Sequence, residues 1–240
     1  MLDKKKFYIN GKWVPPFKKN DFEVINPSSE EVFAIISLGG KEDVNIAVKA
    51  AKDAFDNWKD TKKEERIIFL EKLLKIYKKR FNEMAEAMSK EMGAPIDYAT
   101  TVHASSGQSH IEDFILRLKN FKFEESFDSK SNNHIAHEPI GVCGLITPWN
   151  WPINQIALKV IPALATGCTM ILKPSEISPI SAMLFAEMID EAGFPVGVFN
   201  LVNGDGAGTG TEISGHSDID MISFTGSTRA GKLITKNAAN

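Results

Sequence analysis

The stretch TPWNWPINQ, residues 147–155, holds one amide side chain in an unusual setting. Asn150 stands between Trp149 and Trp151, and Pro148 and Pro152 bracket the three residues. Each proline fixes its own φ angle, so the segment is expected to be stiff. A side-chain amide held in one direction can donate a hydrogen bond to an oxygen on which negative charge develops. The structural alternative is an amide that only bonds the backbone of its own loop.

The stretch KPSE places a cation and a carboxylate three residues apart. Lys173 ends a short apolar run, and Glu176 follows it. A lysine beside a carboxylate can bind the hydroxyl groups of an adenosine ribose. On local pattern alone, a lysine that extends its ammonium group to solvent beside an exposed glutamate is an equal alternative.

Two glycine-rich stretches are imperfect matches to phosphate-binding motifs. In NGDGAGTG, Thr209 occupies the position where the dinucleotide fingerprint G-x-G-x-x-G needs a glycine. In FTGSTRAGKL, the run from Gly226 to Lys232 fits G-x-x-x-x-G-K, but Leu233 cannot bind magnesium as the expected serine or threonine would. A weaker interpretation holds for the second stretch. Gly226 lets the backbone approach a ligand, and Ser227 opens a helix whose free amides favour an anion.

The sequence contains only two cysteines, Cys143 and Cys168. Cys143 lies in an apolar strand pattern and Cys168 at a helix-to-strand turn, where thiols are usually structural. Two cysteines exclude a disulfide framework and fit a reducing compartment. His134 and His137 stand three apart in a strand-like segment and would point to opposite faces, so no metal site is predicted.

The segments that must position these residues alternate regularly from residue 140 onward. Strands are predicted over 140–147, 169–173, 198–202 and 220–225, with helices over 153–167, 178–193 and 227–237. This alternation predicts an α/β fold with a Rossmann-like parallel sheet and helices on both faces. Such sheets bind ligands at the carboxyl ends of their strands, where all four unusual stretches lie.

The first 139 residues predict an accompanying segment. Residues 1–40 have the pattern of short strands and turns, including an Asn10–Gly11 turn. Three helical stretches follow: one near 44–58, one with its inner face between Ile67 and Met88, and one ending at about Asn120. Residues 121–139 predict a β-hairpin with phenylalanines largely on one side. Such a hairpin can pair with another subunit or be an ordinary surface hairpin.

Composition excludes several classes of protein. The 240 residues carry a net charge of −3, with 43% hydrophobic and 25% charged residues, as in ordinary globular proteins. The charge gives no reason to expect nucleic acid or an anionic membrane as a partner. No apolar run approaches the ~18 residues of a membrane span, and the first ten residues lack the apolar core of a signal peptide. We therefore expect a cytoplasmic protein.

The run GLITPWNWPINQIALKVIPALATGCTMILKPSE, together with FNLVNGDGAGTG and FTGSTRAG, closely resembles the NAD(P)-dependent aldehyde dehydrogenase superfamily. The similarity covers essentially the whole chain, including INGKWV and INPSSEEVFA near its start. The resemblance implies that residues 1–120 form the N-terminal part of the cofactor-binding domain and 121–139 a β-hairpin oligomerisation arm. Residues 140–240 would form the NAD-binding Rossmann-like domain.

The resemblance also implies roles for single residues. Asn150 would donate its amide to the carbonyl oxygen of the substrate, and Glu176 would favour NAD over NADP by crowding a 2′-phosphate. The implied cofactor-binding residues are a cleft wall, a ribose site, a glycine loop and a pyrophosphate turn, with their neighbours: Ile146, Thr147, Pro148, Trp149, Lys173, Pro174, Ser175, Glu176, Gly206, Gly210, Phe224, Thr225, Gly226 and Ser227.

The chemistry of this family needs two further groups. A cysteine attacks the aldehyde to form a thiohemiacetal, hydride passes to NAD, and a glutamate-activated water releases the carboxylic acid. That glutamate belongs to an E-L-G-G motif, and the one similar string here has Ser37 in its place. We therefore expect the cofactor-binding half of an aldehyde-oxidising homo-oligomer (dimer or tetramer), inactive as the chain alone. A non-catalytic nucleotide-binding or interaction module is the alternative.

Overall fold

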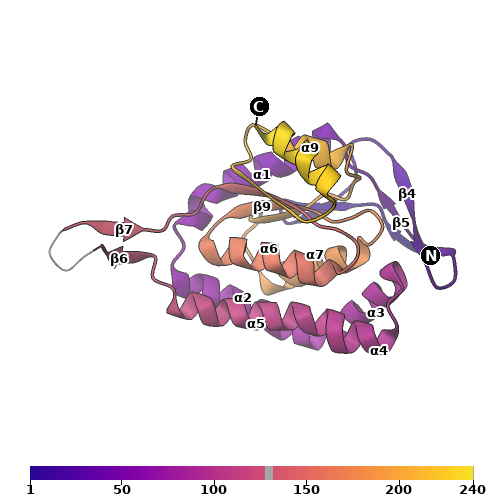
Figure 1. Ribbon diagram of the computed structural model, residues 1–240, viewed down its shortest axis with the longest axis horizontal. Helices are drawn as coiled ribbons and strands as arrows, with labels where there is room; N and C mark the ends of the chain where they lie inside the picture. Colours follow the sequence, from indigo (N-terminus) through magenta and orange to yellow (C-terminus); the bar gives the residue numbers. More distant parts are fainter. Residues whose placement is uncertain (128–131, 240) are drawn as a thin grey trace.

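The computed structural model describes residues 1–127 and 132–239. A sheet lies at its centre (Figure 1). Its strand order is β11-β8-β9-β10-β2-β3. Neighbouring strands among β8, β9, β10 and β11 pair in parallel, which confirms the predicted Rossmann-like parallel sheet. These strands are β8 (Val142–Ile146), β9 (Thr169–Lys173), β10 (Phe199–Leu201) and β11 (Met221–Phe224).

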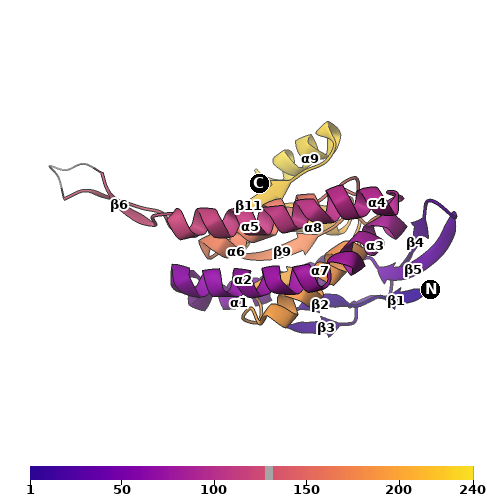
Figure 2. The ribbon, with the colours of Figure 1, turned by 90° about the horizontal axis from the view of Figure 1, so that it is seen from below.

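The N-terminal residues extend this sheet, which the sequence pattern did not reveal. Strand β2 (Phe7–Ile9) pairs antiparallel with β10, and β3 (Lys12–Val14) pairs antiparallel with β2. Asn10 and Gly11 connect them with φ angles of 51° and 71°, the left-handed conformation that the Asn-Gly turn predicts. A second sheet, in the order β1-β5-β4, contains β1 (Leu2–Lys4), β4 (Asp21–Asn26) and β5 (Glu31–Ser37) (Figure 2).

Helices cover both faces of the central sheet. Helix α1 (Lys41–Lys59) packs on one face, and α6 (Pro152–Thr166) and α7 (Ile180–Ala192) pack on the other. Helices α2 (Lys63–Lys79) and α5 (Ser105–Asn120) form an outer layer over α6 and α7. Because strand residues alternate between faces, Val142, Ile146 and Ile171 join the cluster around α1, while Leu145 and Leu172 join the other.

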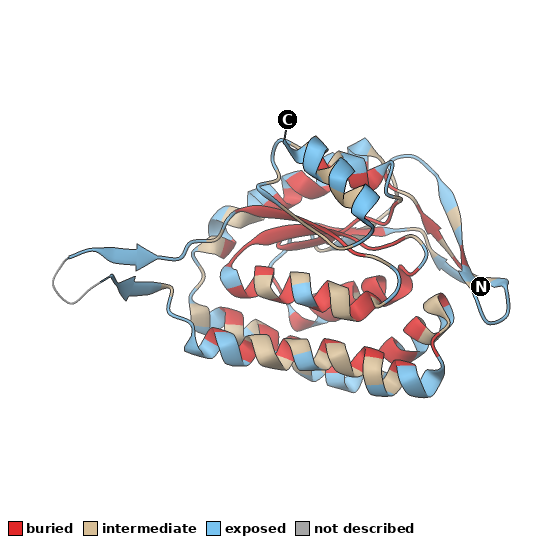
Figure 3. Cartoon of the chain, viewed as in Figure 1, coloured by how far each residue is buried: buried red, intermediate tan, exposed pale blue. Residues whose placement is uncertain are grey.

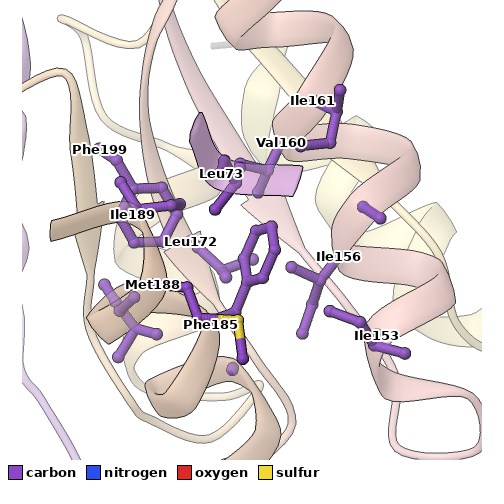
Figure 4. Close-up of a cluster of buried hydrophobic side chains, with 14 of the residues drawn as sticks. Leu73, Ile153, Ile156, Val160, Ile161, Leu172, Phe185, Met188, Ile189 and Phe199 are labelled. Carbon is purple, nitrogen blue, oxygen red and sulfur yellow. The ribbon is translucent and has the colours of Figure 1, made fainter. Parts of the chain in front are cut away.

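The larger cluster lies between the sheet and the α6–α7 layer. Leu172 and Phe199 contribute from the strands, and Phe185, Val160 and Leu73 contribute from the helices (Figure 4). All five side chains are at most 2% exposed. The sheet and the inward faces of these helices form one continuous buried region (Figure 3). This buried region is the rigid support from which the loops at the strand ends project.

Two sequence predictions for the helices were wrong. The predicted helix through Met88 is two helices, α2 and α3 (Phe81–Met92), because Arg80 leaves helical geometry at φ −102° and ψ 18°. Its guanidinium instead binds Glu187 at 2.8 Å and Glu191 at 2.5 Å. A short helix that was not predicted, α8 (Thr209–Ser214), begins within the last two residues of NGDGAGTG. The helical stretch to Asn120 comprises α4 (Ile96–Tyr98), the π-helix η1 (Ala99–Ala104) and α5.

The predicted hairpin projects away from the body of the molecule (Figures 1 and 2). Strand β6 (Glu124–Ser126) pairs antiparallel with β7 (His134–Ala136), and all six residues are exposed. At the base of the hairpin the rings of Phe121 and Phe123 pack edge to face, with 4.8 Å between their centroids. Phe127 is 65% exposed. The predicted turn around Ser131 falls partly in residues 128–131, outside the described residues. An oligomerisation role stays a prediction.

Candidate ligand site at the carboxyl ends of the parallel strands

Backbone hydrogen bonds hold the ends of the four parallel strands together. The Thr147 N–H donates to the Lys173 carbonyl at 3.1 Å, and the Thr225 N–H donates to the Ile146 carbonyl at 3.2 Å. On the other side of β9, the Val202 N–H donates to the Leu172 carbonyl at 3.0 Å. The loops that carry the predicted site residues therefore start from adjacent positions on one edge of the sheet.

The PWNWP loop leaves the core and returns to it within a few residues. Thr147 is 3% exposed, Trp149 is 50% exposed, and Asn150 is exposed beside it. Pro152 then begins α6 at the first helical position, where its missing N–H costs no hydrogen bond. Among the described residues the Asn150 side chain makes no hydrogen bond, so its amide N–H groups remain able to serve a ligand.

The PWNWP loop rests on residues from the π-helix and α5 that sequence analysis missed. The Trp151 ring lies 5.4 Å from the ring of His103, which is 4% exposed, and burial lowers the His103 pKa. One turn into α6, the Asn154 side-chain oxygen lies 2.7 Å from Nε2 of His110. No local pattern predicts a π-helix, although such segments are frequent at functional sites.

Lys173 is not a lysine extended to solvent. It is 3% exposed, and its ammonium group donates to the carbonyls of Pro174 at 2.9 Å and Gly204 at 2.6 Å. The Glu176 carboxylate lies 3.8 Å away. Burial lowers the pKa of Lys173, and the nearby carboxylates of Glu176 and Asp205 oppose that shift. The Lys173 ammonium group is therefore held inside the fold and does not extend to solvent, as the alternative interpretation of the KPSE pattern would require.

The glycine-rich loop closes over Lys173. The buried Gly210 donates its N–H to the Asp205 carbonyl at 3.0 Å, and a Cβ added at Gly210 would lie 3.9 Å from Cδ of Lys173. Thr209, which spoiled the dinucleotide fingerprint, donates its hydroxyl to the Gly39 carbonyl at 2.5 Å and so ties the loop to the segment before α1. Gly206 instead faces open space.

The FTGS turn leads from β11 into α9 (Thr228–Ala238). A Cβ added at Gly226 would lie 2.5 Å from the Phe224 ring, so any other residue at this position would force that ring to move. The Ser227 hydroxyl caps α9 by accepting the Ala230 N–H at 3.2 Å. The turn is also held by Lys159 of α6, whose ammonium group donates to the Thr225 hydroxyl at 2.7 Å. Lys159 was missed, although it is the one charged residue in the apolar sequence of α6.

Both thiols lie at the other edge of the sheet. Cys143 and Cys168 are 0% and 4% exposed and stand at the amino ends of β8 and β9. Their mutual hydrogen bond and burial raise the pKa of Cys143, and the same hydrogen bond lowers the pKa of Cys168. The length of β9 separates Cys168 from Lys173 by about 16 Å. Neither thiol can therefore reach a ligand held by the loops.

Residues 1–127 and 132–239 also lack two other features. These residues contain no cluster of three or more histidine, cysteine or acidic side chains that could hold a metal ion. In the same part of the chain, no helix combines the length and the apolar character needed to span a membrane.

Comparison with known proteins places this arrangement in a family. The aldehyde dehydrogenase family model matches residues 13–240. The chain is 50% identical to 3-succinoylsemialdehyde-pyridine dehydrogenase from a Pseudomonas species, covering 100% of this chain and 50% of the relative. A crystal structure of aldehyde dehydrogenase from Bartonella henselae superposes with a TM-score of 0.98 at 57% identity, over 100% of this chain and 50% of that one.

A second solved structure carries ligands. It is a variant of aldehyde dehydrogenase C from Pseudomonas syringae in complex with NAD⁺ and octanal. Its TM-score is 0.95 at 46% identity, over 98% of this chain and 48% of that chain. The chain therefore spans about half the length of the relatives that it matches.

Proposed function

Because this chain belongs to the aldehyde dehydrogenase family, we propose that its loops at the carboxyl edge of the sheet bind NAD for the oxidation of an aldehyde to a carboxylic acid. The observation that carries the proposal is the buried Lys173 ammonium group, held between two loop carbonyls beside the Glu176 carboxylate. A structural relative holds NAD⁺ and octanal. The proposed substrate of the complete enzyme is accordingly an aldehyde.

The donors and acceptors of Lys173 and Glu176 fit the adenosine ribose of NAD. An ammonium group has three N–H donors, and two of those of Lys173 meet carbonyls. The third donor, 3.8 Å from Glu176, and the partly buried Glu176 carboxylate can bind vicinal hydroxyls. A carboxylate repels the 2′-phosphate of NADP by charge, so this pair favours NAD and leaves NADP as the weaker alternative.

The pyrophosphate of NAD fits the turn before α9. Helix α9 begins at Thr228, and its first backbone N–H groups lack helical partners and carry partial positive charge. Gly226 has no side chain to block the approach, and Gly206 faces open space on the neighbouring loop. Ile146, Thr147, Pro148 and Trp149 form the remaining wall. The buried Thr147 hydroxyl has no hydrogen-bond partner among the described residues and can serve a bound cofactor.

When bound, NAD supplies the acceptor for the hydride that leaves the substrate. The contribution of this chain to the chemistry is the side chain of Asn150. Its exposed amide can donate to the aldehyde oxygen as negative charge develops there, because PWNWP holds that side chain outside the core at the start of α6.

The remaining parts of the proposal concern organisation. Residues 1–120 and 140–240 together form the cofactor-binding part, since β2 and β3 complete the sheet of β8 to β11. The hairpin at 121–139 serves as the oligomerisation arm of a homodimer or homotetramer in the full-length, cytoplasmic enzyme. Its six paired residues are exposed, and Ile135 is among them.

Isothermal titration of the chain with NAD tests the proposal. We expect a Kd between about 1 µM and 1 mM, the usual range for enzyme ligands. Lys173→Met keeps the volume of the side chain but removes its charge and donors, and should weaken binding by at least about tenfold. Lys75→Met on the exposed face of α2 is the matched control. Absence of NAD binding, or equal affinity of Lys173→Met and wild type, would overturn the proposal.

A further inference from the structure

Glu91 is a buried carboxylate that the proposed function does not use. It lies near the end of α3 and is 1% exposed. Its oxygens accept the Ile180 N–H at 2.5 Å and the Ser181 N–H at 3.2 and 3.3 Å, and they also accept the Ser181 hydroxyl. Every one of these donors belongs to the first turn of α7.

These bonds supply a helix cap from a distant part of the chain. The first amides of a helix have no partners within it, and the residue before α7, Pro179, provides no side-chain cap. Glu91, 89 residues before Ile180, fills that role, and its carboxyl group lies at the positive end of the helix dipole. Burial raises the pKa of Glu91 to about 7, while its hydrogen bonds with Ser181 and Ile180 oppose the shift.

The capped turn is directly joined to the ribose site. Only residues 174–179 separate Lys173, at the end of β9, from Ile180, at the start of α7. Within that loop Ser175 and Ser178 are buried, and the Ser178 N–H donates to the Ser175 carbonyl at 3.2 Å. The sheet holds one end of the loop and Glu91 holds the other. Glu176 lies in the middle of this loop, between the two held ends.

We propose that Glu91 is a positioning residue for the ribose site: it fixes the start of α7 and thereby sets the Glu176 carboxylate beside Lys173. This role rests on the proposed binding of NAD, because a fixed conformation of the 174–179 loop affects a ligand only if the loop binds one. It also predicts that loss of the cap changes both the affinity for NAD and the discrimination against NADP.

The test uses three variants and a control in the 240-residue chain. Glu91→Ala removes all four bonds, Glu91→Gln keeps the shape and one acceptor oxygen, and Ser181→Ala removes one donor from the other side. Glu86→Ala, an exposed glutamate of the same helix, is the control. Each protein is titrated with NAD and NADP below its melting temperature. Amide hydrogen exchange of the 174–181 segment is measured without a cofactor.

For Glu91→Ala we expect NAD affinity to fall about tenfold, the scale of a lost helix cap. Its preference for NAD over NADP should fall as well, because Glu176 is no longer held in place. Exchange in 174–181 should accelerate. Glu91→Gln and Ser181→Ala should have NAD affinities and exchange rates between those of Glu91→Ala and wild type. If Glu91→Ala does not fold, these two variants are compared with wild type instead. A merely structural cap would lower the melting temperature and leave both affinities of the folded protein unchanged, which would overturn the proposal.

The two proposals fail in different ways. If wild type binds NAD and the Glu91 variants bind it equally well, the positioning role is wrong and the proposed function stands. If wild type binds no NAD, the proposed function is wrong. The ribose-site role of Glu91 then fails with it, and hydrogen exchange reports only whether Glu91 orders the 174–179 loop.

Discussion

The two edges of the parallel sheet use their polar groups differently. At the amino edge, the free thiols of Cys143 and Cys168 share a hydrogen bond. The buried Arg66 guanidinium there donates to the carbonyls of Ala165 at 3.1 Å and Thr61 at 2.8 Å. At the carboxyl edge, Asn150 is exposed with its amide unbonded among the described residues, and Gly206 faces open space. The groups named at the first edge are buried in the fold, where Nε of Arg66 lacks a partner among the described residues, whereas Asn150 at the second edge is exposed and able to meet the proposed ligand.

The direction of the chain explains the contrast. Each parallel strand leads into a helix, so α6, α7 and α9 begin near the carboxyl edge and present backbone N–H groups there. The same helices end toward the opposite edge, where carbonyls need donors such as Arg66. An anionic, hydroxyl-rich ligand such as NAD therefore suits only the carboxyl edge.

The largest predicted contrast concerns turnover. The 240-residue chain supplied with NAD and an aldehyde should produce no NADH above background, because both of its thiols lie at the amino edge. Cys143→Ala and Cys168→Ala should leave NAD affinity unchanged. Robust NADH production that disappears in Cys168→Ala would show that a thiol at the amino edge does the chemistry, and the division between the edges would be wrong.

The next effect concerns Asn150 at the carboxyl edge. In a full-length enzyme carrying this sequence, Asn150→Ala should lower kcat by about 10²–10³, the cost of losing one oxyanion donor. Asn150→Asp should be at least as damaging, because a carboxylate cannot donate and repels the developing charge. NAD affinity should change little, since Lys173 and the α9 turn bind the cofactor. Steady-state kinetics and NAD titration separate the two effects.

The outcome for Asn150 also distinguishes the structural alternative. A drop in melting temperature and in NAD affinity together, with kcat spared, would mean that Asn150 only supports its loop. A stable variant with wild-type kcat would remove Asn150 from the chemistry altogether.

Because Glu91 is buried, the free energy of unfolding of the protein should depend on pH. Its pKa is about 7 in the folded protein and 4.5 when unperturbed, so the folded state binds the proton more tightly. The resulting stability is fully present below pH 4.5 and is lost as the pH rises through about 7. The loss is on the order of 3 kcal/mol at most. Chemical denaturation of wild type and Glu91→Gln should show the difference between them changing across this window. A constant difference would contradict the buried-acid interpretation.

The smallest predicted effect concerns cofactor choice. Glu176→Gln removes the charge that repels a 2′-phosphate, and should improve NADP affinity relative to NAD by about threefold, on the scale of an exposed charge interaction. Glu64→Gln, at an exposed glutamate of α2, is the matched control. Equal relative affinities in Glu176→Gln and wild type would remove Glu176 from cofactor selection.

Local patterns predicted the parts of the fold and the site that depend on neighbours in sequence. Strand β9 from Thr169 to Lys173 and the cap at Ser227 are examples, because alternation and helix starts are short-range signals. The missed features depend on distant contacts. Asn10 donates its N–H to the side chain of Asn200, 190 residues away, and Glu91 caps a helix 89 residues later. Likewise, the helical pattern between α2 and α3 is interrupted at Arg80, whose guanidinium forms ion pairs with Glu187 and Glu191 of α7.

Amide chemical shifts of the isotopically labelled chain during titration with NAD test the central claim most directly. We predict that the perturbed amides cluster in the PWNWP loop, the 174–176 loop, the 204–210 loop and the turn at 225–228, all at the carboxyl edge. Amides at the amino edge, such as those of Gly141, Gly167 and Cys168, should not shift. Perturbations centred on the amino edge, or none anywhere at saturating NAD, would contradict the account.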